Sequence, residues 1–196
     1  MELPRARTRR PAEERRAQIL EAALHCFGTK GFHAATMDDL VRASGLSKGS
    51  LYWHFEGKRA VFLAIVDSFA SATFGDWDEL LAEGCTALEV VDAVVCRAFE
   101  RFADASMLSA WAEFFADAEA RERLAAVYAE VRKRLAGALR RDVERGLLRA
   151  LDAEGVAAAL TGAAEGLMLQ SMVDEGFDLR GHWRVTMDVM RRGIEA

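Results

Sequence analysis

The chain has 196 residues, of which 52% are hydrophobic and 29% are charged. This composition is typical of a folded globular protein and excludes an intrinsically disordered chain. The formal net charge is −5, but residues 1–60 carry eleven Lys or Arg and seven Asp or Glu, a formal charge of +4, and the remainder carries −9. A basic N-terminal part on an acidic body favours a polyanionic partner at one end only, although a solvated charge run gives similar numbers.

The cysteines and the apolar segments indicate where the protein resides. Cys26, Cys85 and Cys96 are far apart and lack the spacing of a metal site, so we expect reduced thiols and no metal or cofactor. The basic N-terminus is not followed by an apolar segment of the signal-peptide type, and no uninterrupted apolar run reaches the roughly 18 residues of a membrane span. The sequence therefore predicts a cytoplasmic protein that does not cross a membrane.

Helical signals extend through the whole chain after its N-terminus. Both prolines, Pro4 and Pro11, lie near the start, and residues that favour helices (Ala, Leu, Glu and Arg) are abundant. No segment alternates apolar and polar residues between turn signals, so we expect no sheet. The predicted fold class is all-α with about nine helices. Apolar spacing, caps and glycines place them at 11–30, 37–43, 48–54, 58–74, 86–104, 106–117, 119–145, 153–174 and 180–194.

The helices predicted at 37–43 and 48–54 are short and are joined by a tight turn that contains Gly45. Such a pair is typical of a helix-turn-helix, whose second helix enters the major groove of DNA. Glycine suits the turn because it adopts a left-handed backbone without steric cost. Three leucines are spaced to fill the angle between the helices: Leu40, Leu46 and Leu51. The sequence therefore predicts a three-helix DNA-binding domain at the N-terminus.

The candidate DNA contacts surround this turn. The second helix begins with small or flexible hydrogen-bond donors, followed by side chains able to reach the DNA backbone. Thr36 provides a capping hydroxyl at the start of the first helix. The candidates are Thr36, Ser47, Lys48, Gly49, Ser50, Tyr52, Trp53, His54 and Lys58. The alternative for Ser47 and Ser50 is a capping role alone.

The amino-acid residues in and around this motif resemble those of a known family. The segments ILEAA at 19–23, TMDDL at 36–40 and SGLSKGSLYWHF at 44–55, followed by Lys58, resemble the TetR (tetracycline-repressor-like) family of bacterial regulators. The resemblance covers about residues 12–66. It implies a symmetric dimer whose two recognition helices read successive major grooves of a palindromic operator, and a C-terminal domain that binds a small effector and usually releases the DNA.

The resemblance also assigns roles to single residues. Thr36, Tyr52, His54 and Lys58 are expected to contact phosphates, and residues 47–50 are expected to face the groove. The sequence departs from the family pattern at Arg59, where an acidic residue is common. We interpret this departure as a more basic DNA-binding face.

The resemblance divides the chain into three parts: a basic flexible arm at 1–10, a helix-turn-helix domain at 11–57 and an effector-binding and dimerisation domain at 58–196. The arm, with four arginines, either enters a minor groove or serves as a solubilising tail. In the family the last two helices pack against a second copy, so a homodimer through 153–174 and 180–194 is expected. The alternative is that both helices belong to an internal core.

Aromatic and methionine side chains of the C-terminal part suit a small apolar or amphipathic effector. The candidate lining residues are Phe74, Trp77, Phe99, Met107, Trp111, Phe114, Phe115, Glu165 and Met168, with Glu113 and Gln170 as further polar handles. The alternative for each aromatic residue is plain core packing.

Two other function classes fit the sequence less well. The four histidines are far apart, and no HExxH, GxSxG, P-loop or GxGxxG motif occurs, so the sequence gives no reason to expect an enzyme. A non-specific architectural DNA protein conflicts with the acidic body and the large C-terminal part. The sequence predicts a sequence-specific transcriptional regulator, of the repressor type, released from its operator by a small molecule.

Overall fold

The computed structural model describes residues 12–102 and 107–196, apart from the side chains of residues 102 and 107–109. This part of the chain folds into nine α-helices and no sheet, which confirms the predicted fold class. The helices are α1 (Ala12–Lys30), α2 (Met37–Ser44), α3 (Lys48–His54), α4 (Lys58–Ala82), α5 (Ala87–Phe102), α6 (Met107–Ala116), α7 (Ala118–Glu144), α8 (Ala153–Val173) and α9 (Leu179–Ile194). The predicted basic arm at 1–10 lies outside the described residues.

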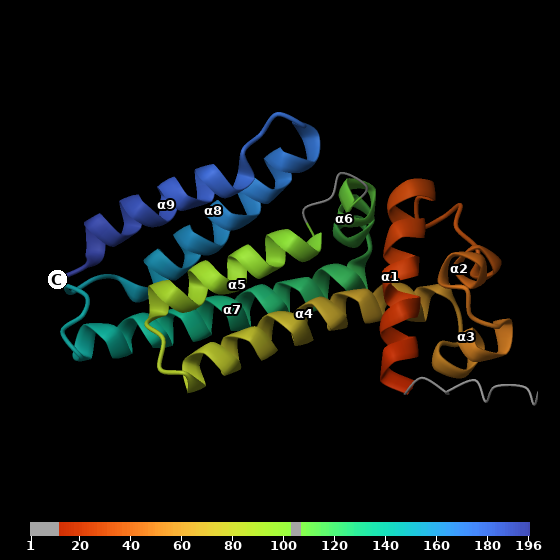
Figure 1. Ribbon diagram of the computed structural model, residues 1–196, viewed down its shortest axis with the longest axis horizontal. Coiled ribbons are helices and arrows are strands. Elements are labelled where there is room, and N and C mark those ends of the chain that lie inside the picture. Colours follow the sequence, from red (N-terminus) through yellow and green to blue (C-terminus); the bar gives the residue numbers. More distant parts are fainter. Residues whose placement is uncertain (1–11, 103–106) are drawn as a thin grey trace, which may run out of the picture.

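The molecule is elongated, with α1 to α3 gathered at one end (Figure 1). We call this end the head (residues 12–57) and the remainder the body. α4 starts directly after the head, passes α1 and continues far along the body, so that it connects the two ends. α8 and α9 lie side by side along one edge of the body, with α9 outermost (Figure 1).

The helix-turn-helix is built as its sequence predicts. Thr36 caps the start of α2. The helix ends at Gly45, whose φ of 65° is the left-handed value that glycine tolerates. Ser47 caps α3, because its hydroxyl accepts a hydrogen bond from the backbone N–H of Ser50. The predicted plug is confirmed: Leu40 and Leu51 are fully buried, and Leu46 packs partly buried against them.

Two hydrophobic clusters form the interior. The first joins the head to the body, because Phe27 of α1 and Leu51 of α3 share it with Phe62 of α4 and Phe114 of α6. The second fills the far end of the body around Trp77, Leu139, Leu160, Trp183 and Met187. A displacement of α6 therefore reaches the head through packed side chains rather than through a flexible linker.

α4 extends beyond its predicted end at residue 74 to Ala82. Gly75 follows the predicted end, and glycine costs a helix interior about 1 kcal/mol relative to alanine. Packing overrides this preference, since Trp77 and Leu80 are buried against α5 and α7. Asp76, also buried, accepts hydrogen bonds from Arg97 and Arg101 of α5, which fixes this end of α4 against its neighbour.

Two helices of the described part, α4 and α8, are long and apolar enough by composition to span a membrane, although charged residues interrupt the apolar run of each. Half of the apolar window of α4 is buried inside the molecule, as in the core helix of a soluble protein, against 17% of the window of α8. The apolar surface of α8 therefore needs a separate explanation.

Candidate nucleic-acid interface and effector cavity

α3 is anchored on one side and open on the other. Leu51, in its middle, and Phe55, which follows it, are buried in the first cluster. The opposite face presents Tyr52, 47% exposed, and Trp53, 73% exposed. Ser47, Lys48 and Gly49 are exposed at the first turn, and Ser50 is half-buried. The predicted groove residues thus lie together on one accessible surface at the end of the molecule.

Lys48 is held in place by Asp38, an acidic residue in the first turn of α2. Its ammonium donates a hydrogen bond to a carboxylate oxygen of Asp38 over 2.9 Å, and both side chains are largely exposed. This carboxylate raises the pKa of Lys48, so the side chain stays charged. Asp38 is therefore a further candidate for contact with base edges, because a carboxylate accepts from the amino group of cytosine while lysine donates to guanine.

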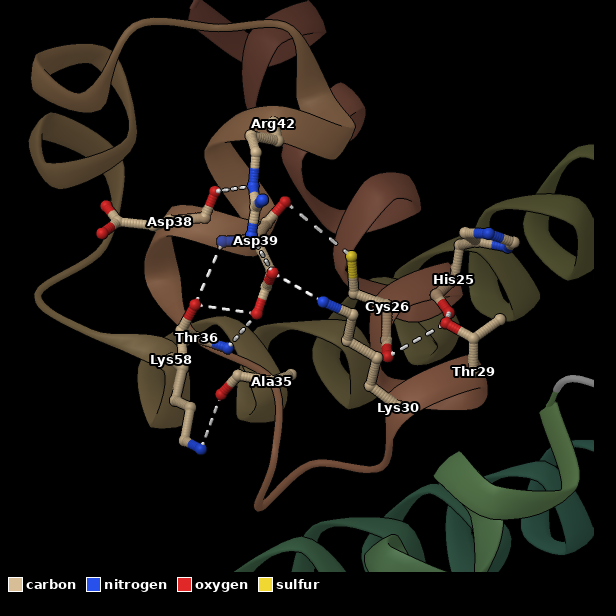
Figure 2. A network of polar contacts seen from close by, with 10 residues as sticks. All are labelled: His25, Cys26, Thr29, Lys30, Ala35, Thr36, Asp38, Asp39, Arg42 and Lys58. Carbon is tan, nitrogen blue, oxygen red and sulfur yellow. Dashed lines mark hydrogen bonds and ion pairs between the residues drawn. The ribbon is translucent and has the colours of Figure 1, made fainter.

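Thr36 belongs to a capping box whose acidic member is Asp39 (Figure 2). The carboxylate of Asp39 accepts from the backbone and hydroxyl of Thr36 at 2.9 and 2.8 Å, and also pairs with Lys30 of α1 and Arg42 of α2. The hydrogen bonds from Lys30 and then from Thr36 hold the pKa of Asp39 well below its usual range. The exposed Thr36 is thereby fixed at the N-terminus of α2.

Lys58 lies at the start of α4, where the resemblance placed it, and its ammonium contacts the protein's own backbone. Its ammonium donates to the backbone carbonyl oxygens of Phe32, His33 and Ala35, each over 2.8 Å, and lies 4.8 Å from the centre of the Phe32 ring. An ammonium has three N–H donors, and all three are engaged. In this structure Lys58 ties α4 to the loop between α1 and α2 and has no donor left for a phosphate.

His54 also faces inward. Its Nε2 is buried and has no hydrogen-bond partner among the described residues, and its ring packs edge-on against Trp53 at 4.5 Å between centroids. Burial, and then repulsion from Arg15 and Arg16, lowers the pKa of His54, so its ring is neutral at pH 7. The phosphate contact expected of His54 would require this nitrogen to turn outward.

Arg59 does not enlarge the basic DNA-binding face, contrary to our interpretation of the sequence. Its guanidinium pairs with Asp117, the N-cap of α7, at 2.6 Å and with Glu119 at 2.9 Å. Both acids belong to the body. The departure from the family pattern at this position therefore creates an ionic link between the start of α4 and the start of α7.

Comparison with known proteins shows which family the chain belongs to. A sequence model described as "Bacterial regulatory proteins, tetR family" matches residues 19–65, and one described as "BetI-type transcriptional repressor, C-terminal" matches residues 86–194. The chain is 32% identical over 188 residues to the HTH-type transcriptional regulator TtgR of Pseudomonas putida, covering 89% of each chain. The chain belongs to the TetR family of bacterial regulatory proteins.

Other TetR-family relatives agree with this assignment. The chain is 33% identical over 174 residues to the probable regulator ArpR of Pseudomonas putida, covering 83% of this chain and 82% of that one. The structure of SmeT of Stenotrophomonas maltophilia superimposes with a TM-score of 0.72 at 24% identity, over 92% of this chain and 90% of that one, and shows the same fold. This TetR-family protein is accordingly a helix-turn-helix transcriptional regulator, and the matched relatives are regulators rather than enzymes.

In the body of this TetR-family regulator, two of the predicted effector residues line one cavity. Trp111 and Phe114 of α6 meet Leu24 of α1, Ile65 of α4 and Leu124 of α7 around a space of about 10 Å³. This volume holds about one water molecule. The cavity is apolar and small, so a larger ligand requires the helices that line it to move apart.

The other predicted lining residues separate into three groups. Phe74 packs under the guanidinium of Arg134, and Trp77 and Phe99 belong to the second cluster, so these three are not at the cavity. Phe115 is about half exposed and stacks on Trp111 from outside. The side chain of Met107 lies outside the described part. Helical periodicity alone did not separate these positions, because core and ligand-lining aromatic residues have the same spacing.

The polar handles differ from one another in burial. Gln170 is exposed, and Glu113 pairs with His33 of the head at 3.5 Å. Glu165 of α8 is the one whose carboxylate enters the interior: its Oε1 is buried without a hydrogen-bond partner among the described residues, and burial raises the pKa of this carboxyl, with Tyr128 of α7 as a neighbour that lowers it. Tyr128 was missed by the sequence interpretation because a single tyrosine on a charged helix gives no signal of its own.

Proposed function

We propose that this TetR-family regulator binds a palindromic operator as a homodimer, with α3 of each copy in a major groove. The observation that supports this most is the exposed face of α3, which carries Lys48 and Tyr52 while Leu51 holds the helix from behind. Groove contacts are proposed for residues 47–50, with Trp53 at their edge. Phosphate contacts are proposed for Thr36 and Tyr52.

The homodimer is proposed to form through α8 and α9. Four of the large apolar side chains exposed in the described part lie on these two helices: Leu169, Val173, Val185 and Val189. Several exposed large apolar side chains on two neighbouring helices are typical of a subunit interface. A second copy packed on it also explains why α8 is apolar yet little buried within one chain. A cytoplasmic location follows from this function, since operators lie in the cytoplasm of bacteria.

The proposed domain division places residues 12–57 with the DNA and residues 58–196 with the effector and the second copy. The effector is proposed to enter the cavity under α6. Phe114 of α6 lies 4.6 Å from Phe62 of α4, and Phe62 lies 4.5 Å from Phe32 of the head, measured between ring centroids. Because packed aromatic rings transmit displacement, opening of the cavity shifts the head. In a dimer, this shift changes the separation of the two α3 helices, and the operator is released. A protein that binds its operator until an effector releases it is a repressor.

The test is selection of bound DNA from random duplexes, followed by titration of the enriched site with unlabelled competitor. The proposal predicts enrichment of an inverted repeat and a preference over random duplex of about 10³-fold or more. It also predicts a steep loss of affinity between 50 and 200 mM salt, since each phosphate contact releases counterions. Binding of all duplexes with equal affinity would support the non-specific architectural alternative instead.

A further inference from the structure

A groove between α4 and α7 opens to solvent near the end of α4 that is farther from the head. Its volume is about 250 Å³, and it shares no lining residue with the cavity under α6. Trp77 and Leu81 of α4 form one side of the groove, and Gly137 and Ala138 of α7 form the other. Gly137 is exposed, and a Cβ added at this position would lie within 4 Å of no other segment. The groove is therefore a separate surface feature with room for a small molecule.

Trp77 carries a hydrogen-bond donor that has no acceptor. Its side chain is 1% exposed, and its Nε1 is buried without a hydrogen-bond partner among the described residues. Trp183, the other tryptophan of the second cluster, differs in this respect, because its Nε1 donates to a carboxylate oxygen of Asp92 over 2.9 Å. Buried indole N–H groups usually find an acceptor, since an unsatisfied buried donor destabilises the fold. An acceptor that binds in the groove beside Trp77 can supply the missing hydrogen bond.

Two arginines of α7, Arg134 and Arg141, border the same groove. Their side chains are 28% and 35% exposed. The hydrogen bonds of Arg134 leave its Nη2 without an acceptor among the described residues, and those of Arg141 leave its Nη1 without one. Asp78 and Glu130, which pair with Arg134, do not line the groove, and none of the described residues that line it is acidic. The free donors and the charge of this groove therefore favour an anion.

We propose that this groove is a second ligand site, separate from the effector cavity, and that it takes a small aromatic carboxylate. The carboxylate accepts hydrogen bonds from the indole N–H of Trp77 and from a guanidinium, which is a strong donor to carboxylates. The ring of the ligand packs on Leu81 and Ala138. Because Nε1 of Trp77 is covered in this structure, binding includes a rotation of a flexible arginine side chain. A volume of about 250 Å³ limits the ligand to a small one.

The test is a titration of the full-length protein with 2-naphthoate and with its neutral counterpart 2-naphthamide, followed by nuclear magnetic resonance of the indole N–H groups. The four tryptophans give four such resonances, and replacement of single tryptophans by phenylalanine assigns them. The proposal predicts that 2-naphthoate shifts the resonance of Trp77 in a saturable manner. Its affinity should exceed that of 2-naphthamide at least about fivefold, because only the carboxylate forms charged hydrogen bonds with the arginines.

Three variants test the walls of the groove. Gly137→Leu fills it from α7, keeps both arginines and suits a helix better than glycine does, so it should abolish the shift of Trp77. Arg134→Gln should lower the affinity for 2-naphthoate about fivefold and leave that for 2-naphthamide unchanged. Arg132→Gln is the matched control, because Arg132 is an exposed arginine of the same helix that does not line the groove, and it should keep both affinities.

The resonance of Trp111 separates this site from the effector cavity, which Trp111 lines. A shift of Trp111 without a shift of Trp77 would place the probe in the cavity and overturn the second site, while leaving the proposed effector response intact. The absence of any indole shift, or equal affinities for the carboxylate and the amide, would also overturn it. Undiminished binding of 2-naphthoate by Gly137→Leu would do the same.

Discussion

The ammonium of Lys58 lies 2.8 Å from the carbonyl oxygen of Ala35, the residue that precedes the N-cap of α2 (Figure 2). Two further carbonyl oxygens, those of Phe32 and His33, complete its hydrogen bonds. The residue that sequence resemblance assigned to a phosphate thus fixes the loop from which α2 begins. Charged hydrogen bonds to backbone oxygens are stronger than neutral ones, so this contact holds the loop before α2 firmly against the start of α4.

Lys58→Met is expected to lower the free energy of unfolding by about 2 kcal/mol, because three carbonyl oxygens lose a charged donor. Urea titrations followed by circular dichroism measure this. Operator and random DNA should lose affinity to the same modest degree. A variant of wild-type stability that has lost operator affinity more than tenfold would show instead that the ammonium binds a phosphate.

Lys48→Ala is expected to weaken operator binding by about 1–3 kcal/mol and to relax the preference at one base pair of each half-site, since lysine donates to base edges. Asp38→Asn tests the carboxylate that pairs with Lys48. We expect the base preference to change. The affinity for random duplex should stay the same or increase, because the substitution removes a negative charge near the phosphates. Anisotropy titrations with single-base operator variants measure both. Lys133→Ala, an exposed lysine on α7, is the control and should leave every titration unchanged.

Thr36 is expected to act through its hydroxyl in two ways. Thr36→Val removes the cap of α2 and should destabilise the protein by about 1 kcal/mol, and it should also weaken binding to all DNA sequences alike. Thr36→Ser retains the hydroxyl and should keep both properties near wild type. Thermal unfolding and anisotropy titrations report them separately. Equal behaviour of the serine and valine variants would contradict both roles.

His54 predicts a pH dependence of stability. Its pKa is lower in the folded protein than the ordinary 6.5, so the neutral ring is the form compatible with folding. This contribution is fully present well above pH 6.5 and is lost as the pH falls from there through the folded-state pKa. His54→Phe should flatten the stability curve between pH 7.5 and 5.5, measured by urea unfolding at each pH. A curve identical to that of the wild type would show that His54 does not titrate differently on folding.

Val185→Glu combined with Val189→Glu should convert the dimer into monomer, because two charges would be buried without partners. Loss of the dimer should lower operator affinity by orders of magnitude, since one half-site then binds alone. Analytical ultracentrifugation measures the mass. Ala125→Glu, on the exposed side of α7, is the matched control and should remain dimeric. A dimeric double variant would place the interface elsewhere.

Local signals explain how much of this structure the sequence predicted. The caps Thr36 and Ser47, the glycine at position 45 and the leucine plug are decided by neighbouring residues, so the helix-turn-helix was predicted with its boundaries. The end of α4 was wrong because burial of Trp77 overrides Gly75.

Contacts between distant segments were beyond local signals. Lys58 reaches back 23 to 26 residues to its carbonyl partners, and Arg59 reaches forward 58 residues to Asp117. A lysine or arginine beside a DNA-binding motif gives the same sequence signal whether it faces phosphate or protein. Aromatic residues carry the same ambiguity. Trp111, at the cavity, and Trp77, in the core, can be distinguished only once α6 and α7 are placed in space.

The most direct test of the account is DNA selection from one random pool by the wild type and by a variant that carries Ser47→Ala, Lys48→Ala and Tyr52→Phe. These changes leave Leu51 and the buried side of α3 intact. The account predicts that the wild type enriches an inverted repeat with its two halves in successive major grooves, and that the variant, folded and dimeric, enriches none. Enrichment of the same site by both proteins would contradict the claim that the exposed face of α3 reads the operator.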